Sequence, residues 1–483
     1  MIRALVVLIV GLALPGALPA LAVVRRSPVI IFLAPFIGAT MAAVAAELEL
    51  GTNGSLVMWY VIIAVATNMA VAAWWLVTRS SLGRDDPPWT WFTFTAVVML
   101  GAMIVPLTGL RAPMLGYDVS AIWLPHTLMV SGGHQAMLSG LQNVTTANPD
   151  YPPLVPAAGA LAFAFFGRGD LYIAELITVL LNACALGIVG MGIAAVGSKG
   201  SLRLRLIAIV VAGTMCMVGF AVAGDYAVDG YTDLLWSAAA LGAVIWGLVL
   251  PRSNRAFITA WICVAVASLT KNEGLTAALI VLVLITLRYR PLALVRFRRS
   301  TRHPENRDNT DVRTSMTIRG WAERAAFILV PALPGLAWDG LAREVGLKNA
   351  FFGAPSTESP GARFGPAIDG ITSHLLVLPI AVAVFVAGSA LLRRDRELNA
   401  LGHAAWLWMA CLLYLSALLA TYLFGSLEIH WWLRNSVDRT TIFPQIALYT
   451  DLSIWLVIGL GTTSRGDAAP GISRTRPGSP GRA

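Results

Sequence analysis

The chain has 483 residues, of which 57% are hydrophobic and only 13% are charged, and its mean hydropathy is +0.72. Soluble domains carry about 25% charged residues, so this composition excludes a soluble globular protein and indicates an integral membrane protein. The net charge of +9 does not indicate nucleic-acid binding, because the basic residues lie in short loops between apolar runs and no nucleic-acid-binding motif occurs.

The apolar runs recur with the length that a helix needs to cross a bilayer. About 20 residues span the roughly 30 Å of hydrocarbon, and the alternation typical of a barrel strand does not appear. We therefore predict an all-α fold, a polytopic transmembrane helical bundle of about 13 spans. The predicted spans are 5–24, 28–46, 56–78, 93–110, 171–196, 206–223, 231–250, 256–270, 274–287, 325–340, 371–392, 401–424 and 442–462.

The N-terminal run admits two interpretations. Arg3, the apolar stretch after it and the small residues Ala20-Leu21-Ala22 are typical of a signal peptide, which would be removed as residues 1–22. A retained helix is the alternative that we favour, with the N-terminus outside. Residues 1–92 then form a first group of membrane helices.

Whether the short apolar segment 152–166 crosses the membrane decides on which side of the membrane every later loop lies. It opens with three prolines, and we treat it as a shallow or re-entrant helix because most Lys and Arg then fall on one side, which the positive-inside rule makes cytoplasmic. Two segments on that side, the Arg-rich 296–319 and the tail 463–483, are predicted to be disordered. The long loop 111–151 is predicted to lie outside.

With this topology, four polar clusters meet at the outer face, and they contain the candidate functional residues. The clusters are the loop 111–151 with Asp118, His126, His134, Asp150 and Tyr151; the segment 225–233 with Asp225, Asp229 and Asp233; Lys271-Asn272-Glu273-Gly274; and the segment 428–439 with His430, Arg434 and Arg439.

The third cluster is physically the most demanding. A lysine and a glutamate inside apolar sequence cost several kcal/mol unless they pair or face water, so Lys271 and Glu273 are functional candidates. Gly274 can end one helix beside the start of the next, whose N-terminal amides and partial positive charge suit a phosphate. The alternative is a Lys271–Glu273 pair at a loop tip just outside the membrane.

The acidic residues of the first two clusters suggest two kinds of chemistry. Asp118 can act as a general base on an acceptor hydroxyl, or as a metal ligand. Asp229 and Asp233, with Asp225 nearby, offer the hard oxygen ligands that Mg²⁺ or Mn²⁺ prefers. Helix caps and solvated loop acids are the structural alternative for each of them.

The last cluster combines aromatic and basic residues. His430 is followed by Trp431 and Trp432, whose ring faces could line a sugar subsite, although an interfacial aromatic belt explains the tryptophans equally well. Arg434 and Arg439 run against the positive-inside trend on the outer side, which favours a bound anion at one of them.

In these residues the chain resembles the GT-C superfamily of polyprenyl-phosphate-sugar glycosyltransferases, in particular the bacterial relatives of protein O-mannosyltransferases and aminoarabinose transferases. The resemblance covers roughly 93–460. The matching segments are Gly116-Tyr117-Asp118 with Ala121-Ile122-Trp123, Asp150-Tyr151-Pro152-Pro153-Leu154, Gly230-Tyr231-Thr232-Asp233-Leu234, Leu269-Thr270-Lys271-Asn272-Glu273-Gly274-Leu275 and Ser436-Val437-Asp438-Arg439.

The resemblance implies a catalytic domain at 93–462 with a large extracytoplasmic first catalytic loop. It implies that Asp118 is the catalytic aspartate, that Asp233 is a second acid with Asp229 as its competitor, and that Lys271 contacts the lipid phosphate. The helices of 1–92 depart from the family pattern, as does the lack of a soluble domain after the last span, which leaves the acceptor open. The residues that we assign to substrate binding are Lys271, Glu273, Asp229, Asp150, Tyr151, His430, Arg434 and Arg439.

These patterns favour a glycosyltransferase at the outer face of a bacterial plasma membrane. It would move a sugar from a polyprenyl-phosphate donor among the membrane lipids to an extracytoplasmic glycan, lipid or protein. A transporter or lipid flippase that uses Lys271 and Glu273 in a broken helix is the first alternative. A non-catalytic assembly protein of the envelope, with merely solvated outer acids, is the second.

Overall fold

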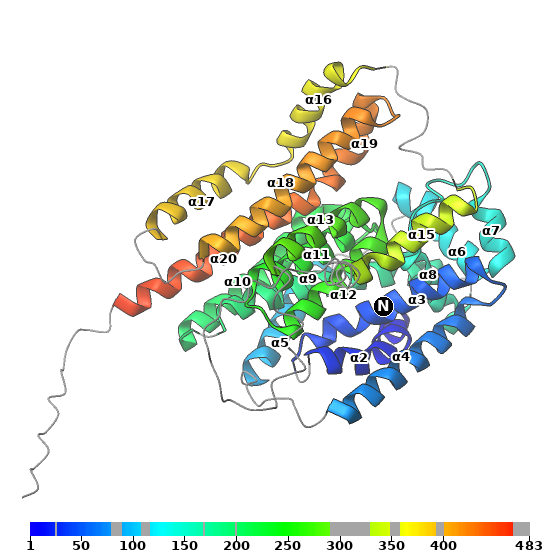
Figure 1. Cartoon of the computed structure of the whole chain (residues 1–483), viewed down its shortest axis with the longest axis horizontal. Coiled ribbons are helices and arrows are strands. Elements are labelled where there is room, and N and C mark those ends of the chain that lie inside the picture. The colour runs from blue at the N-terminus through cyan, green and yellow to red at the C-terminus, as the bar shows by residue number, and fades with distance from the viewer. Residues whose placement is uncertain are drawn as a thin grey trace, which may run out of the picture.

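The chain is helical throughout the part that the structure describes (Figure 1). The computed structural model describes residues 1–24, 27–78, 89–107, 116–167, 170–198, 200–289, 329–347, 358–392 and 400–466. No strand occurs within these ranges, so the prediction of an all-α fold is confirmed. The predicted disordered loop 296–319 lies outside the described residues. Of the predicted disordered tail 463–483, residues 463–466 belong to the last helix, which ends at Gly466, and the rest lies outside the described residues.

The N-terminal helices form a hairpin to which a further helix packs. Pro19 lacks an N–H, so the carbonyl of Pro15 one turn earlier has no donor within its own helix. The side chain of Asn68 on the packed helix donates to that carbonyl at 2.9 Å, which joins the helices where the ladder is interrupted. The segments are α1 (Ile2–Val6), η1 (Val7–Ala13), α2 (Leu14–Val24), α3 (Ile30–Gly51) and α4 (Leu56–Thr78).

Helix α9 (Leu171–Val196) runs through the interior, and most of its surface is buried among neighbouring helices. Its Asn182 is buried and donates to the carbonyls of Ala227 at 3.0 Å and Tyr231 at 3.3 Å. One amide in the helix thus fixes the loop that leads into the next buried helix. The segments around α9 are α5 (Trp89–Leu107), η2 (Val119–Trp123), α6 (Leu124–Ser131), α7 (His134–Leu141), α8 (Leu154–Phe166) and α10 (Leu202–Ala223).

The central helices of the fold turn sharply at Lys271. Helix α12 ends at Thr270, Lys271 is extended, and α13 begins at Asn272. A helix break is therefore present as predicted, but it lies at Lys271, and Gly274, which we expected to end a helix, lies in the first turn of α13. A Cβ added at Gly274 would lie 2.2 Å from the backbone oxygen of Ala267, so only glycine lets the two helix ends approach this closely. The segments are η3 (Gly224–Ala227), α11 (Asp233–Val244), η4 (Ile245–Val249), α12 (Asn254–Thr270) and α13 (Asn272–Tyr289).

The C-terminal helices, drawn from yellow to red in Figure 1, lie along one side of the central group. Helices α18 and α20 pack against each other, and the short α19 joins them. The segments are η6 (Val330–Ala332), α15 (Leu333–Glu344), α16 (Pro360–Ser373), α17 (Leu378–Leu392), α18 (Ala400–Phe424), α19 (Ile429–Thr440) and α20 (Ile442–Gly466).

Seven helical segments in the described part are long and apolar enough to cross a membrane. The number rises to eight if α16 and α17, which bend by 74° where they meet, form one broken span. Several other predicted spans correspond to shorter apolar helices, so the figure of 13 stays a prediction. The seven segments are Ile2–Val24, Ile30–Gly51, Leu56–Leu76, Leu171–Val196, Leu202–Ala227, Ala404–Phe424 and Ile429–Leu460.

Two local features bear on the predicted topology. Helix α8, within the predicted re-entrant segment 152–166, has 13 residues, fewer than the roughly 20 that cross a bilayer. The segment 428–439, which we predicted as a polar cluster before the last span, is the helix α19. Glu428 caps the helix α19 by accepting hydrogen bonds from the backbone N–H groups of His430 at 2.9 Å and Trp431 at 2.6 Å.

The hydrogen bonds that Glu428 accepts from these two backbone N–H groups hold the pKa of its carboxyl group below its usual range.

Candidate functional site

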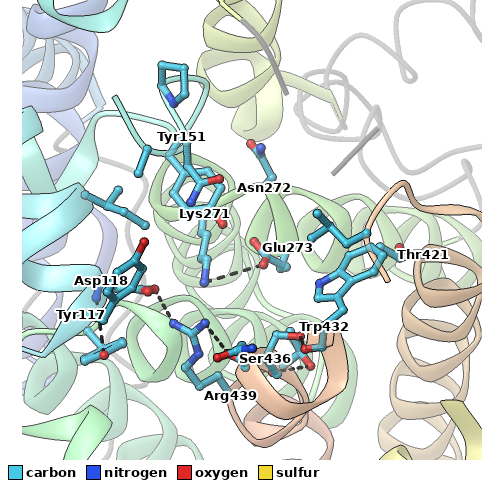
Figure 2. A pocket seen from close by; sticks show the side chains of 18 of the residues that line it. Tyr117, Asp118, Tyr151, Lys271, Asn272, Glu273, Thr421, Trp432, Ser436 and Arg439 are labelled. Atoms are coloured by element: carbon cyan, nitrogen blue, oxygen red, sulfur yellow. Dashed lines mark hydrogen bonds and ion pairs between the residues drawn. The ribbon is translucent and has the colours of Figure 1, made fainter. Parts of the chain in front are cut away.

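A cavity of about 880 Å³ lies where the four predicted polar clusters meet (Figure 2). Its volume is within the range of small-molecule sites, roughly 300–1,000 Å³. The first cluster contributes Asp118 and Tyr151, the second contributes Tyr226 and Tyr231 but none of its aspartates, the third contributes Lys271, and the fourth contributes Arg439. Segments far apart in the sequence therefore line one cavity. The sequence-based hypothesis had predicted that these polar clusters meet in a shared cavity.

Lys271 is held by an ion pair in the protein interior. Its ammonium lies 2.9 Å from Oδ1 of Asp233, the first residue of α11, and the two side chains are 3% and 1% exposed. Glu273 Oε1 lies 3.7 Å from the same ammonium, and the ring of Tyr151 lies beneath it at 5.5 Å. Lys271 and Glu273 line the cavity, whereas Asp233 lies behind Lys271 and is not part of the lining.

The second ion pair joins Asp118 to Arg439 across the cavity (Figure 2). The guanidinium Nη1 donates to the Asp118 carboxylate, and Nη2 donates to the carbonyl of Asn435 one turn earlier in α19, at 2.7 Å. The rings of Tyr226 and Tyr231 lie 5.9 and 5.5 Å from the guanidinium carbon, which places the cation over two aromatic faces.

Tyr226 and Tyr231 belong to the segment before α11. Through their hydroxyl groups they also hold the two chain segments that carry Asp118 and Arg439. The hydroxyl of Tyr226 donates to Asp438 at 2.5 Å, and the hydroxyl of Tyr231 accepts from the backbone N–H of Asp118 at 3.5 Å. A Cβ added at Gly116 would lie 2.3 Å from the Tyr231 ring, so the loop of Asp118 can pass the ring only with glycine there.

Asp150 lies outside the cavity lining, and its hydrogen bonds hold neighbouring parts of the cavity wall in place. Its carboxylate accepts a hydrogen bond from Asn272 at 2.7 Å, and its backbone carbonyl accepts one from the indole of Trp338 at 2.8 Å. Burial raises the pKa of Asp150 to about 6. The next residue, Tyr151, stacks on Trp123 with 5.6 Å between ring centroids. The loop is thereby fastened on both sides of the Tyr151 ring that underlies Lys271.

A buried arginine that we did not single out from the sequence holds the chain before α19. Arg363 of α16 is 1% exposed and donates to the carbonyls of Gly425 and Leu427, both at 2.6 Å. Its Nε lies 3.4 Å from a carboxylate oxygen of Glu358, and that carboxylate also accepts from the backbone N–H of Ile429 at 3.3 Å. Arg363 therefore fixes the turn from which the Arg439 helix departs.

The remaining predicted site residues lie at the edge of the cavity or away from it. Arg434 is exposed and lines the cavity, whereas the exposed His430 beside it does not. Asp229 is buried and does not line the cavity. Burial and the neighbouring charge of Asp225 raise the pKa of Asp229.

The predicted Mg²⁺ or Mn²⁺ ligands do not form a matching donor set. Among the described residues, no group of three or more His, Cys, Asp and Glu is arranged to hold a metal ion. Asp233 uses one carboxylate oxygen for Lys271, and neither Asp229 nor Asp233 lines the cavity. The basic residues of the lining are Lys271, Arg439 and, at the exposed edge, Arg434.

Hydroxyl and aromatic groups of α18 also line the cavity and were not predicted. Apolar periodicity in the sequence does not distinguish them from ordinary lipid-facing or core positions. These residues are Tyr414, Thr421 and Tyr422.

No protein-family model, curated protein or solved structure matches the chain.

Proposed function

We propose that the chain is a membrane glycosyltransferase that moves a sugar from a polyprenyl-phosphate-linked donor to an extracytoplasmic acceptor. The observation that supports it most is a carboxylate, Asp118, in one cavity with the buried cation Lys271 and the partly buried cation Arg439, within a highly apolar helical chain. Sugar transfer from a lipid phosphate needs these groups: a base for the acceptor and fixed positive charge for the departing phosphate.

The reaction that fits the cavity is a displacement at the anomeric carbon. Asp118 accepts the proton of an acceptor hydroxyl as its oxygen forms a bond to that carbon. The bond between the carbon and the phosphate oxygen breaks, and its electron pair stays on the phosphate, whose charge changes from −1 to −2. Lys271 and Arg439 stabilise this added charge without reorganisation because Asp233, Asn435 and the aromatic rings already hold them in place.

The walls of the cavity suit the other parts of the substrates. Trp431 and Trp432 on α19 supply ring faces of the kind that stack on sugars, and both line the cavity. Ala417 and Leu418 of α18 add an apolar wall, which is suited to the first isoprene units of the donor. The acceptor is a glycan, lipid or protein at the outer face of a bacterial plasma membrane, and we assign it no finer identity.

Radiolabelled sugar transfer tests the proposal. Membranes that contain the chain should incorporate label from a polyprenyl-phosphate-sugar into an acceptor fraction, and Asp118→Asn should abolish incorporation at unchanged protein level. Full activity of Asp118→Asn would disprove the assigned base. A metal chelator added to the same assay tests the sequence-based prediction of Mg²⁺ or Mn²⁺ dependence, with Asp229→Asn as the variant that leaves the Lys271–Asp233 pair intact.

One observation favours a transporter or lipid flippase as the second candidate. The break between α12 and α13 places Lys271 and Glu273 at facing helix ends, a geometry that transporters use at their binding sites. Reconstituted vesicles separate the two functions: movement of a lipid-linked sugar across the bilayer without sugar transfer would decide for the transporter.

A further inference from the structure

The two cations deep in the cavity are already neutralised by carboxylates. Lys271 pairs with Asp233 at 2.9 Å and lies 3.7 Å from Glu273, while Arg439 pairs with Asp118. Three carboxylates thus face two cations, and the group carries a net negative charge when all five are ionised. A phosphate that entered this arrangement unchanged would meet repulsion, so at least one carboxylate has to give up its cation.

The structure limits which carboxylate can move. Asp233 is 1% exposed and lies outside the cavity lining, so an entering anion does not reach it. Glu273 also lines the cavity, but its departure would free no cation, because Lys271 stays paired with Asp233. Asp118 lines the cavity at the N-terminal end of the helix η2 and is the carboxylate that pairs with Arg439. The other terminal nitrogen of Arg439 donates to the carbonyl of Asn435, so a ligand that replaces Asp118 would leave the guanidinium in place.

We propose that the donor phosphate displaces Asp118 from Arg439, and that this exchange switches on Asp118 as the base. The inference rests on the proposed function and adds an order of events to it. While Asp118 is paired with Arg439, the guanidinium occupies an oxygen of its carboxylate. Once the phosphate takes the guanidinium, that oxygen is free to accept a hydrogen bond from the acceptor hydroxyl.

The exchange makes acceptor activation depend on a bound donor. The acceptor's proton goes to Asp118, its oxygen bonds to the anomeric carbon, and the phosphate leaves with the electron pair of the broken bond. Arg439 holds the resulting dianion together with Lys271. After the lipid phosphate departs, Asp118 returns its proton to water and pairs with Arg439 again, which restores the starting arrangement.

The binding of farnesyl phosphate by the full-length chain in detergent tests the exchange. Removing the competing carboxylate should strengthen binding, so Asp118→Asn should lower the Kd at least about fivefold even though the variant transfers no sugar. Asp369→Asn, which removes an exposed carboxylate on α16 outside the cavity lining, is the matched control and should bind like the wild type. Asp118→Ser serves as a second variant if Asp118→Asn does not fold.

A double-mutant cycle separates ion-pair exchange from general charge repulsion. In an Arg439→Gln background there is no ion pair to break, so the gain from Asp118→Asn should disappear. An equal gain with and without Arg439 would overturn the exchange and leave only repulsion. If the wild type transfers sugar but Asp118→Asn does not bind more tightly, the exchange alone fails. If the wild type neither binds farnesyl phosphate nor transfers sugar, the proposed function fails as well.

Discussion

The ammonium of Lys271 and the carboxylate of Asp233 form a 2.9 Å ion pair between residues that are 38 positions apart. Both side chains are almost completely buried, at 3% and 1% exposure. Asp233 begins α11, and Lys271 occupies the break between α12 and α13, so the packing of these three helices creates the pair. The pair explains how a lysine can stay charged at this depth while its ammonium still faces the cavity.

Asp233→Leu should strongly destabilise the chain, because it leaves the Lys271 ammonium buried without its closest partner. Breaking a buried ion pair on one side costs about 3–5 kcal/mol. The measurement is thermal unfolding of the purified chain in detergent, and the expected result is a clearly lowered Tm.

The double variant Asp233→Leu with Lys271→Met is the matched control for that loss. Replacing both charges by apolar groups removes the uncompensated ammonium and should return most of the stability, whereas sugar transfer should stay absent because the phosphate has lost a cation. A single variant Asp233→Leu that melts like the wild type would show that the pair does not support the fold.

Asp150 should make the stability of the chain depend on pH. Burial raises its pKa from 3.8 to about 6, so the folded chain binds the proton more tightly than the unfolded chain. The resulting stabilisation is complete below pH 3.8 and is lost as the pH rises through about 6. Asp150→Asn removes this contribution while keeping a carbonyl that can accept from Asn272.

The difference in Tm between wild type and Asp150→Asn, measured from pH 4 to pH 7, reports this effect. The wild type should lose stability relative to the variant as the pH rises, by at most about 3 kcal/mol for a shift of this size. Parallel curves for the two proteins across that range would contradict it.

Arg363→Ala should loosen the turn before α19. The variant leaves the carbonyls of Gly425 and Leu427 without their donor, at a cost of about 1–3 kcal/mol for each buried group. Because the turn carries the helix of Arg439, sugar transfer should fall together with Tm. Arg343→Ala, which removes an arginine exposed on α15, is the control and should change neither. A normal Tm for Arg363→Ala would show that the turn holds without it.

Composition and local pattern were enough to predict the long apolar helices and a break within 271–274, which lies at Lys271 and not at Gly274. The four polar clusters were also recognisable, because charged residues interrupt apolar sequence only at a few positions. The amphipathic helix α19 was missed, although Ile429, Trp432, Leu433 and Val437 repeat at helical spacing after an acidic cap. That signal is local and could have been found.

The partners within the site could not be read from local pattern. Asp118 and Arg439 are 321 positions apart, and Arg363 meets carbonyls more than 60 positions away. Such contacts depend on which helices pack together, and a sequence of nearly uniform apolar helices specifies that packing through shape rather than through motifs. The same limit explains why Asp229 was grouped with Asp233 although only the latter lies behind the cavity lysine.

Gly116→Ala should lower sugar transfer without unfolding the chain. The added methyl group would lie 2.3 Å from the ring of Tyr231, so either the ring or the loop has to move. Tyr231 accepts from the backbone of Asp118 and lies against Arg439, and either movement therefore disturbs the Asp118–Arg439 pair. A misplacement of about 1 Å can cost roughly a hundredfold in rate. Gly101→Ala, in the helix α5 with open space around the added methyl group, is the matched control. Equal transfer rates for the two alanine variants, at equal protein level, would show that the close passage of the loop beside Tyr231 does not matter for the reaction.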